Sequence, residues 1–339
     1  MIFGPLPLAE AEGGMLAHAL HLGGQRMAKG SLVDAAILAA ASAAGLERLW
    51  VARLETGDVP EGEAAARIAD AFAGPGIVVR APVHGRVNLH ASADGLLLVA
   101  ADAVMQANRQ SDAIAVSTLP PQTPVRSGDM VGTVKIIPYA LPGAEMDSVL
   151  AAVLALPDHA IDVRPWQPGL RAILIQTRLP DTPDKLIGKT ARVTAARLAR
   201  LGIVMAQAPD VAHEIERLAE AFAEILYAAK PSALVLVAGG TATSDRRDVI
   251  PAAIVAAGGT LLRVGMPVDP GNLLVLGRLG SATVIGLPGC ARSPKRNGLD
   301  LVLEQLAAGL DVTSDQVARM GVGGLLEESG RPVPWAWTG

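Results

Sequence analysis

The chain contains 339 residues, of which 50% are hydrophobic and 18% are charged, and its 36 glycines and 24 prolines favour many short elements in two or three domains. The net charge of −4 argues against a nucleic-acid partner, because phosphate backbones are bound by clustered basic surfaces. The single cysteine excludes an internal disulfide, and the six histidines lack the spacing of a metal site.

Neither a membrane segment nor an export signal is expected from the sequence. The longest apolar stretch, residues 35–46, is about a dozen residues long, whereas a helix needs roughly 20 residues to cross a bilayer. The first residues lack the basic start, the apolar centre and the small-residue cleavage site of a secretory signal. We therefore expect a cytoplasmic protein without a membrane partner.

Residues 1–160 are predicted to form two small parts. In residues 1–75, a small α/β leader, the stretches 8–22 and 31–46 have helical periodicity, Gly23 and Gly24 separate them, and residues 49–54 resemble a strand. In residues 76–160, short apolar runs are separated by Gly, Asn, Asp and Pro. This second segment is therefore predicted to be a β-rich domain.

Residues 170–312, which follow a proline-rich linker, are predicted to form an α/β domain. Strands that alternate with helices indicate right-handed crossovers and a mostly parallel sheet covered on both faces. The predicted strands are 171–176, 203–206, 233–237 and 260–264, and the predicted helices are 190–201, 210–229 and 251–257. Two more strands, 272–276 and 283–287, have too short a connection for a parallel crossover, so one strand should be antiparallel. Residues 313–339 form a C-terminal tail, and the pattern does not decide whether its Trp335 and Trp337 dock on the body or contact a partner.

A glycine-rich loop follows the predicted strand 233–237, at the sheet edge where ligands bind in such folds. Gly239 and Gly240 allow backbone N–H groups to approach an anion, and the next hydroxyls can donate to phosphate oxygens. These hydroxyls belong to Thr241, Thr243 and Ser244. Asp248 has two interpretations that are compatible: the N-cap of the following helix, or a carboxylate that positions Mg²⁺ or a reacting oxyanion.

A second loop, residues 288–295, follows the predicted strand 283–287. Ser293 as N-cap and Pro294 as the first helical residue would begin a helix whose N–H groups and dipole favour an anion. Arg292, Lys295 and Arg296 add positive charge. The alternative is a capped helix with solvated basic residues, and Cys290 is interpreted as a small loop residue, since no histidine is near it in sequence.

A third loop runs from residue 176 to Thr190 and contains a Gly-Lys-Thr triplet at 188–190. A phosphate-binding loop of the Walker type requires glycine at position 183, where Pro183 stands without an N–H and without access to positive φ. The Walker interpretation therefore fails. Thr190 is kept as a candidate phosphate ligand in another geometry.

The first two loops together resemble the molybdopterin-binding domain family. The resemblance is carried by Gly239-Gly240-Thr241 with Arg247-Asp248-Val249 and Pro251, followed by Leu287-Pro288-Gly289 and Ser293. This family includes molybdopterin adenylyltransferases, molybdopterin molybdenumtransferases and the corresponding domains of gephyrin. Residues 266–272, Met-Pro-Val-Asp-Pro-Gly-Asn, are similar to the molybdenumtransferase version.

The resemblance covers about residues 170–310 and implies a three-layer α/β/α domain with one antiparallel strand. It implies molybdopterin or adenylylated molybdopterin as the ligand, Mg²⁺ and molybdate as further species, a homo-oligomer, and a target molybdoenzyme as partner. Asp248 would be the catalytic residue and hold Mg²⁺. The predicted ligand-binding residues are Gly239, Gly240, Thr241, Thr243, Ser244, Arg247, Thr190, Pro288, Gly289, Arg292 and Ser293.

The third loop departs from the family pattern, and this leaves three functions open. Molybdenumtransferases have Thr-Gly-Asp-Glu-Leu after the first core strand, whereas this chain has Gln-Thr-Arg-Leu-Pro at 176–180 and lacks the acidic pair. The leading hypothesis is a transferase that assists adenylylation of molybdopterin or insertion of molybdate. The alternatives are a non-catalytic carrier or chaperone of the cofactor, and a nucleotide-processing enzyme of the competence-damage type.

Overall fold

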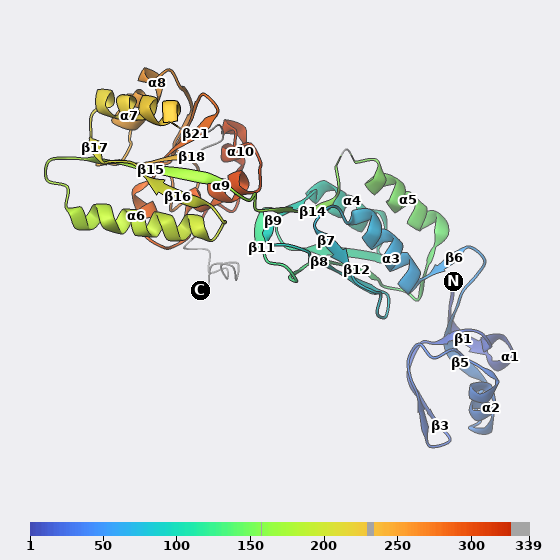
Figure 1. Ribbon diagram of the computed structural model, residues 1–339. Helices are drawn as coiled ribbons and strands as arrows, with labels where there is room; N and C mark the ends of the chain where they lie inside the picture. The colour runs from blue at the N-terminus through green and yellow to red at the C-terminus, as the bar shows by residue number, and fades with distance from the viewer. Residues whose placement is uncertain (157, 229–233, 327–339) are drawn as a thin grey trace. The chain divides into compact units, whose positions relative to one another are not determined.

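A computed structural model describes residues 1–156, 158–228 and 234–326. The chain folds into two compact units, Met1–Val163 and Arg164–Gly339 (Figure 1). Trp335 and Trp337 of the predicted tail lie outside the described residues. Over the part of the chain that is described, no helix has the length and apolar character that crossing a membrane requires.

The first part of unit 1 is a small antiparallel sheet packed on two helices. The order β1-β5-β2 gives the sheet, β3 and β4 pair as a hairpin, and the side chains of Leu16, Leu49 and Val51 are buried in its core. The elements are β1 (Ile2–Pro7), α1 (Leu8–Ala11), β2 (Met15–Leu16), β3 (Leu20–Leu22), β4 (Gln25–Met27), α2 (Ala35–Ala43) and β5 (Arg48–Arg53). The predicted helix 8–22 is wrong: it ends at Ala11, because Gly13 takes a left-handed φ of 75° and the chain then pairs with β5.

The second part of unit 1 has two small sheets covered by helices. Its sheets have the orders β10-β12-β8-β7 and β11-β9-β14, and β6 pairs with β13. The elements are β6 (Asp58–Pro60), α3 (Glu61–Phe72), β7 (Ile77–Val79), β8 (Arg86–Ala91), β9 (Gly95–Val99), α4 (Ala101–Gln110), β10 (Ile114–Thr118), β11 (Thr123–Val125), β12 (Met130–Ile136), β13 (Ala140–Pro142), α5 (Gly143–Leu154) and β14 (Ile161–Pro165). Ile68 and Phe72 of α3 are buried in one core with Leu89 and Val134 of the strands.

Unit 2 contains the mixed sheet that the sequence predicts. Its order is β16-β15-β18-β21-β20-β19, with β17 beside β15, and β20 alone runs antiparallel to its two neighbours among the described strands. The elements are β15 (Arg171–Arg178), α6 (Asp184–Ala199), β16 (Val204–Gln207), β17 (Val211–Ala212), α7 (Ile215–Ala228), β18 (Leu234–Ala238), α8 (Val249–Ala256), β19 (Thr260–Val264), β20 (Val275–Leu279), β21 (Ala282–Gly286), the 3-10 turn η1 (Gly289–Arg292), α9 (Gly298–Ala307) and α10 (Ser314–Arg319). The predicted fold class, with one antiparallel strand, is confirmed.

Helices cover both faces of this sheet and make three layers. Figure 1 shows α7 and α8 on one face and α6, α9 and α10 on the other. Two separate cores correspond to these faces: Phe222 and Ile254 are buried with the first pair of helices, and Leu198 and Leu303 with the second group. Since side chains alternate between the faces of a strand, both faces of β18 are buried and its five residues are all apolar.

Two helix starts differ from the prediction. Helix α6 begins at Asp184, six residues before the predicted start, because Pro183 fits the position that precedes a helix. Helix α7 begins at Ile215 because Val211 and Ala212 first extend the sheet beside β15. Because of the second difference, His213, which follows Ala212, lies at the carboxyl edge of the sheet.

Candidate functional site

The two predicted ligand loops lie side by side at the carboxyl edge of the sheet. Strands β18 and β21 are parallel, with Val237 opposite Gly286. The Leu287 N–H donates to the Val237 carbonyl oxygen at 2.8 Å, and the Arg292 guanidinium donates from Nη2 to the Gly239 carbonyl oxygen at 2.7 Å. The glycine-rich loop and the loop after β21 are therefore joined directly.

Both glycines of the first loop lie in close packing, which is tighter at Gly239 than at Gly240. A Cβ on Gly239 would lie 2.7 Å from the Thr241 carbonyl oxygen, and a Cβ on Gly240 would lie 3.3 Å from Leu179. The Gly240 N–H, predicted to approach an anion, donates instead to Thr177 Oγ1 at 2.8 Å. The Gly240 N–H is therefore occupied by a hydrogen bond within the protein and is not free for an anion in this structure.

A histidine that the sequence interpretation did not select connects this loop to β15. His213 follows β17, and its Nδ1 lies 2.7 Å from Thr177 Oγ1 while its Nε2 lies 2.9 Å from Thr241 Oγ1. Thr177 is buried, with 1% of its surface exposed, whereas Thr241 is exposed. Burial lowers the pKa of His213, and the negative charge of Asp248 opposes this effect.

Asp248 is the N-cap of α8, as one of its two predicted interpretations states. Its Oδ1 accepts the Val249 N–H at 2.8 Å, and its Oδ2 accepts the Ser244 N–H at 3.1 Å. Among the described residues, no three His, Cys, Asp or Glu side chains gather at one place. Mg²⁺ is usually held by one or two carboxylates together with waters and phosphate oxygens, so the role of Asp248 as a Mg²⁺ ligand stays a prediction.

Arg247 and Asp245 form an exposed pair at the outer end of the first loop. Arg247 Nε donates to Asp245 Oδ1 at 2.8 Å, and 91% of the Arg247 side chain is exposed. This pairing raises the pKa of Arg247 and lowers that of Asp245. Within the loop, Thr243 is buried and Ser244 is exposed.

The helix start predicted at Ser293 is wrong. Pro288 precedes η1, and Ser293 follows it with a hydroxyl oxygen that accepts the Lys295 N–H at 3.3 Å. Helix α9 begins at Gly298, with a capping box in which Asn297 Oδ1 accepts the Leu299 N–H and Asp300 Oδ2 accepts the Asn297 N–H. The free N–H groups and the positive end of the dipole of α9 therefore lie at Gly298 and not at Ser293.

Gly289 has no structural requirement for glycine. It is exposed, its φ is not positive, and a Cβ would meet no atom within 4 Å. The nearby Cys290 is half-buried, and burial raises the pKa of its thiol, which agrees with the interpretation of a small loop residue.

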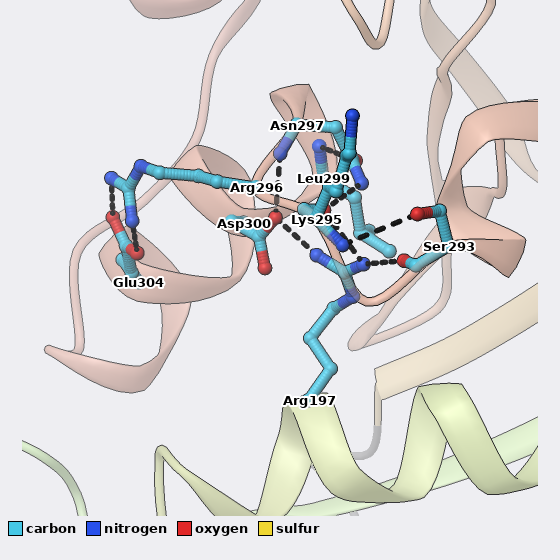
Figure 2. A network of polar contacts seen from close by, with 8 residues as sticks. All are labelled: Arg197, Ser293, Lys295, Arg296, Asn297, Leu299, Asp300 and Glu304. Carbon is cyan, nitrogen blue, oxygen red and sulfur yellow. Dashed lines mark hydrogen bonds and ion pairs between the residues drawn. The ribbon is translucent and has the colours of Figure 1, made fainter. Parts of the chain in front are cut away.

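Arg197 of α6 fixes the second loop from below, as Figure 2 shows. Its Nη1 makes an ion pair with Asp300 Oδ2, and its Nη2 donates to the carbonyl oxygens of Ser293 at 2.7 Å and Lys295 at 3.3 Å. Arg197 is 3% exposed and Asp300 is fully buried. The loop is therefore held by a charged group in a low-dielectric environment.

Arg296, predicted to add positive charge toward an anion, is paired instead with Glu304. The two hydrogen bonds are bidentate, at 2.5 and 2.8 Å, and Glu304 is 1% exposed. Burial raises the pKa of Glu304 to about 7, although the charge of Arg296 opposes this shift. Figure 2 shows this pair on the side of α9 away from Ser293.

Thr190 is not brought to the edge of the sheet with the other candidates. It lies in the second turn of α6, is 2% exposed, and donates from Oγ1 to the Leu186 carbonyl oxygen at 2.9 Å. Two cavities of unit 2, of about 160 and 310 Å³, lie beside α6 at Pro294 and beside α7 at Pro209, and Thr241 and Gly289 line neither. The candidate site is thus formed at the tips of two open loops.

A family model matches part of unit 2. Residues 175–308 match the family described as "Probable molybdopterin binding domain". No curated protein sequence matches the chain significantly. Among solved structures, the chain is similar to the molybdopterin biosynthesis moea protein from Pyrococcus horikosii, with 13% identity over 91% of this chain and 76% of that one and a TM-score of 0.30. It is also similar to the molybdopterin biosynthesis Mog protein from Mycobacterium ulcerans, with 18% identity over 44% of this chain and 99% of that one and a TM-score of 0.28.

Proposed function

We propose, from the match of residues 175–308 to the family described as "Probable molybdopterin binding domain", that this chain binds molybdopterin or its adenylylated form between its two joined loops. The proposed role is to assist adenylylation of molybdopterin or insertion of molybdate. Mg²⁺, molybdate, a homo-oligomer and a target molybdoenzyme remain predictions from the resemblance.

The observation that carries the proposal is the hydrogen bond from Arg292 to the Gly239 carbonyl oxygen at 2.7 Å. It places a positive guanidinium between the glycine-rich loop and the loop that contains Gly289. The exposed hydroxyls of Thr241 and Ser244 lie on the first loop, and an open surface lies over Gly289 on the second. Hydroxyl donors and a guanidinium are the groups that recognise a phosphate monoester, and an uncrowded glycine allows a flat ring to approach the backbone.

A phosphate at this edge would be held by this chain's own residues in three ways. The Arg292 guanidinium has further N–H groups beyond the one that binds Gly239. The hydroxyls of Thr241 and Ser244 are exposed donors. Arg247, which is 91% exposed and paired only locally with Asp245 in the contacts described, can turn toward a ligand at small cost.

A specific observation also favours the second candidate, a non-catalytic carrier. Both carboxylate oxygens of Asp248 already accept backbone N–H groups. Gln176, which stands at the start of the segment that carries an acidic pair in molybdenumtransferases, is 1% exposed and donates to the Ile187 carbonyl oxygen at 3.2 Å. Binding without turnover is therefore the alternative that the same geometry supports.

Replacement of Gly289 by alanine tests the binding proposal. The added methyl meets no protein atom, so folding should be preserved, but the methyl would occupy the space into which the ligand approaches. We expect co-purified pterin, measured by fluorescence and mass after oxidation, to fall about tenfold, which corresponds to about 1.4 kcal/mol. Gly4→Ala is the matched control, because a Cβ there also meets no atom and the position lies in unit 1. Unchanged pterin in Gly289→Ala would contradict this site.

Replacement of Asp248 by asparagine separates the transferase from the carrier. Asparagine is as good an N-cap as aspartate, so α8 should keep its start, while the negative charge and the acceptor for the Ser244 N–H are lost. A transferase should lose turnover, measured as adenylylated product or as molybdate incorporated, and should retain its ligand. A carrier should transfer bound cofactor to an acceptor enzyme at an unchanged rate.

A further inference from the structure

His213 lies between two threonines that belong to different loops. Thr177 is a buried residue next to the last residue of β15, and Thr241 is an exposed residue of the first loop. The two imidazole nitrogens lie 2.7 and 2.9 Å from the two hydroxyl oxygens. Thr177 Oγ1 also accepts the Gly240 N–H at 2.8 Å, so one lone pair of this oxygen is already used. The four groups form one chain of hydrogen bonds.

The direction of this chain decides what the Thr241 hydroxyl can do. A neutral imidazole has one N–H and one acceptor nitrogen, so Thr241 either donates to Nε2 or accepts from it. A protonated imidazole donates from both nitrogens, and Thr241 Oγ1 can then only accept from Nε2. In that state the hydroxyl hydrogen of Thr241 is directed away from His213 and is free for an anion at the loop tip.

On the basis of the proposed function, we propose that His213 is the positioning residue for Thr241, and that it sets whether this hydroxyl donates to the phosphate group of the ligand. The chemical class recognised is a phosphate-like dianion. Anion binding and protonation of His213 are then linked, so each favours the other to the same extent.

The charges around His213 are consistent with such a linkage. Asp248 acts on the imidazole from the start of α8, and the burial of the ring favours its neutral form before a ligand arrives. Arg178 of β15 is neutralised by ion pairs with Asp184 and Asp210. From the loops, Arg292 lies beside Gly239 and Glu214 follows His213 directly in the chain.

The test is a titration of His213 in the full chain with sulfate as the probe, since sulfate is a dianion over the whole range and does not itself titrate. Histidine Cε1 signals are followed by NMR from pH 5 to 8, with chloride at equal ionic strength as the reference and with His213→Gln to assign the signal. We expect sulfate to raise the pKa of His213 by about one unit, equivalent to about tenfold tighter sulfate binding to the protonated form. His90, whose Nδ1 lies 2.8 Å from the Gly128 carbonyl oxygen in unit 1, is the internal control and should not shift.

Two variants complete the test. Thr241→Val should abolish the effect of sulfate on His213, and Thr241→Ser should restore it, because serine keeps the hydroxyl. A His213 titration that sulfate leaves unchanged overturns the inference, whether or not sulfate binds elsewhere. If sulfate shifts the wild-type titration while molybdopterin fails to bind, the proposed function falls and the role of His213 in anion binding stands. If molybdopterin binds while sulfate leaves the His213 titration unchanged, the proposed function stands and the role of His213 in anion binding falls.

Discussion

Replacement of Arg197 by methionine should destabilise unit 2 and release the second loop. Methionine fills a similar volume without a charge, so Asp300 would remain fully buried without its ion-pair partner. Removal of one member of a buried pair costs about 3–5 kcal/mol, because the remaining charge is left uncompensated. The carbonyl oxygens of Ser293 and Lys295 also lose their charged donor.

The assay is urea unfolding of the full chain, followed by hydrogen exchange in peptides from α9. With an m-value of about 2 kcal/mol/M for a unit of this size, a loss of about 4 kcal/mol lowers the midpoint by about 2 M urea. Arg192→Met is the matched control, because Arg192 is an exposed arginine of the same helix. A midpoint shift in Arg197→Met no larger than in the control would refute the argument that this buried pair anchors the loop.

Three further predictions concern neighbouring groups. The pKa of Glu304 is raised from 4.5 to about 7, so the folded state binds its proton more tightly than the unfolded state. The free energy of unfolding should therefore fall as the pH rises from about 4.5 to 7, by up to about 3 kcal/mol. Urea midpoints should show this slope in wild type and not in Glu304→Gln; equal slopes would contradict it. Gly239→Ala should lower the unfolding free energy by about 1–3 kcal/mol, because its Cβ would lie 2.7 Å from the Thr241 carbonyl oxygen, and wild-type stability would refute this crowding. Asp248→Ala removes both acceptors and should cost about 1 kcal/mol or more, whereas Asp248→Asn should cost less, because its amide oxygen keeps one bond while its NH2 group cannot accept the other; thermal unfolding compares the two variants.

The sheet of unit 2 could be predicted well because its strands have clear signals. Strand β18 is a continuous apolar run, and the short connection between β20 and β21 excludes a parallel crossover. The N-terminal helix was predicted wrongly because an alanine-rich periodicity was given more weight than Gly13, which ends α1. A local pattern describes what a segment can form in isolation, and the pairing of β2 with β5 decides the outcome here.

The candidate site was predictable where it depends on strand ends and not where it depends on long-range contacts. Gly239 and Gly289 follow parallel neighbours, so their proximity follows from the topology. The position of His213 could not be predicted from the sequence. The two residues of β17 are too few to give a strand signal, and their pairing with β15 places the histidine that follows them. The start of α9 was placed at Ser293 on a Ser-Pro signal, whereas the capping box at Asn297, with Asp300 three residues later, is the stronger arrangement.

The two loops are held by interactions of very different strength, and this difference determines how a ligand can be accepted. The second loop depends on Arg197 and Asp300, both buried, and moving it would expose an uncompensated charge. In the first loop, the bond from the Gly240 N–H to Thr177 and the bond between Thr241 and His213 join neutral groups, and each contributes only about 1 kcal/mol net and can be exchanged for a bond to a phosphate oxygen. A ligand that binds between them should therefore leave the loop after β21 in place as a template, while the glycine-rich loop exchanges its internal hydrogen bonds for bonds to the ligand.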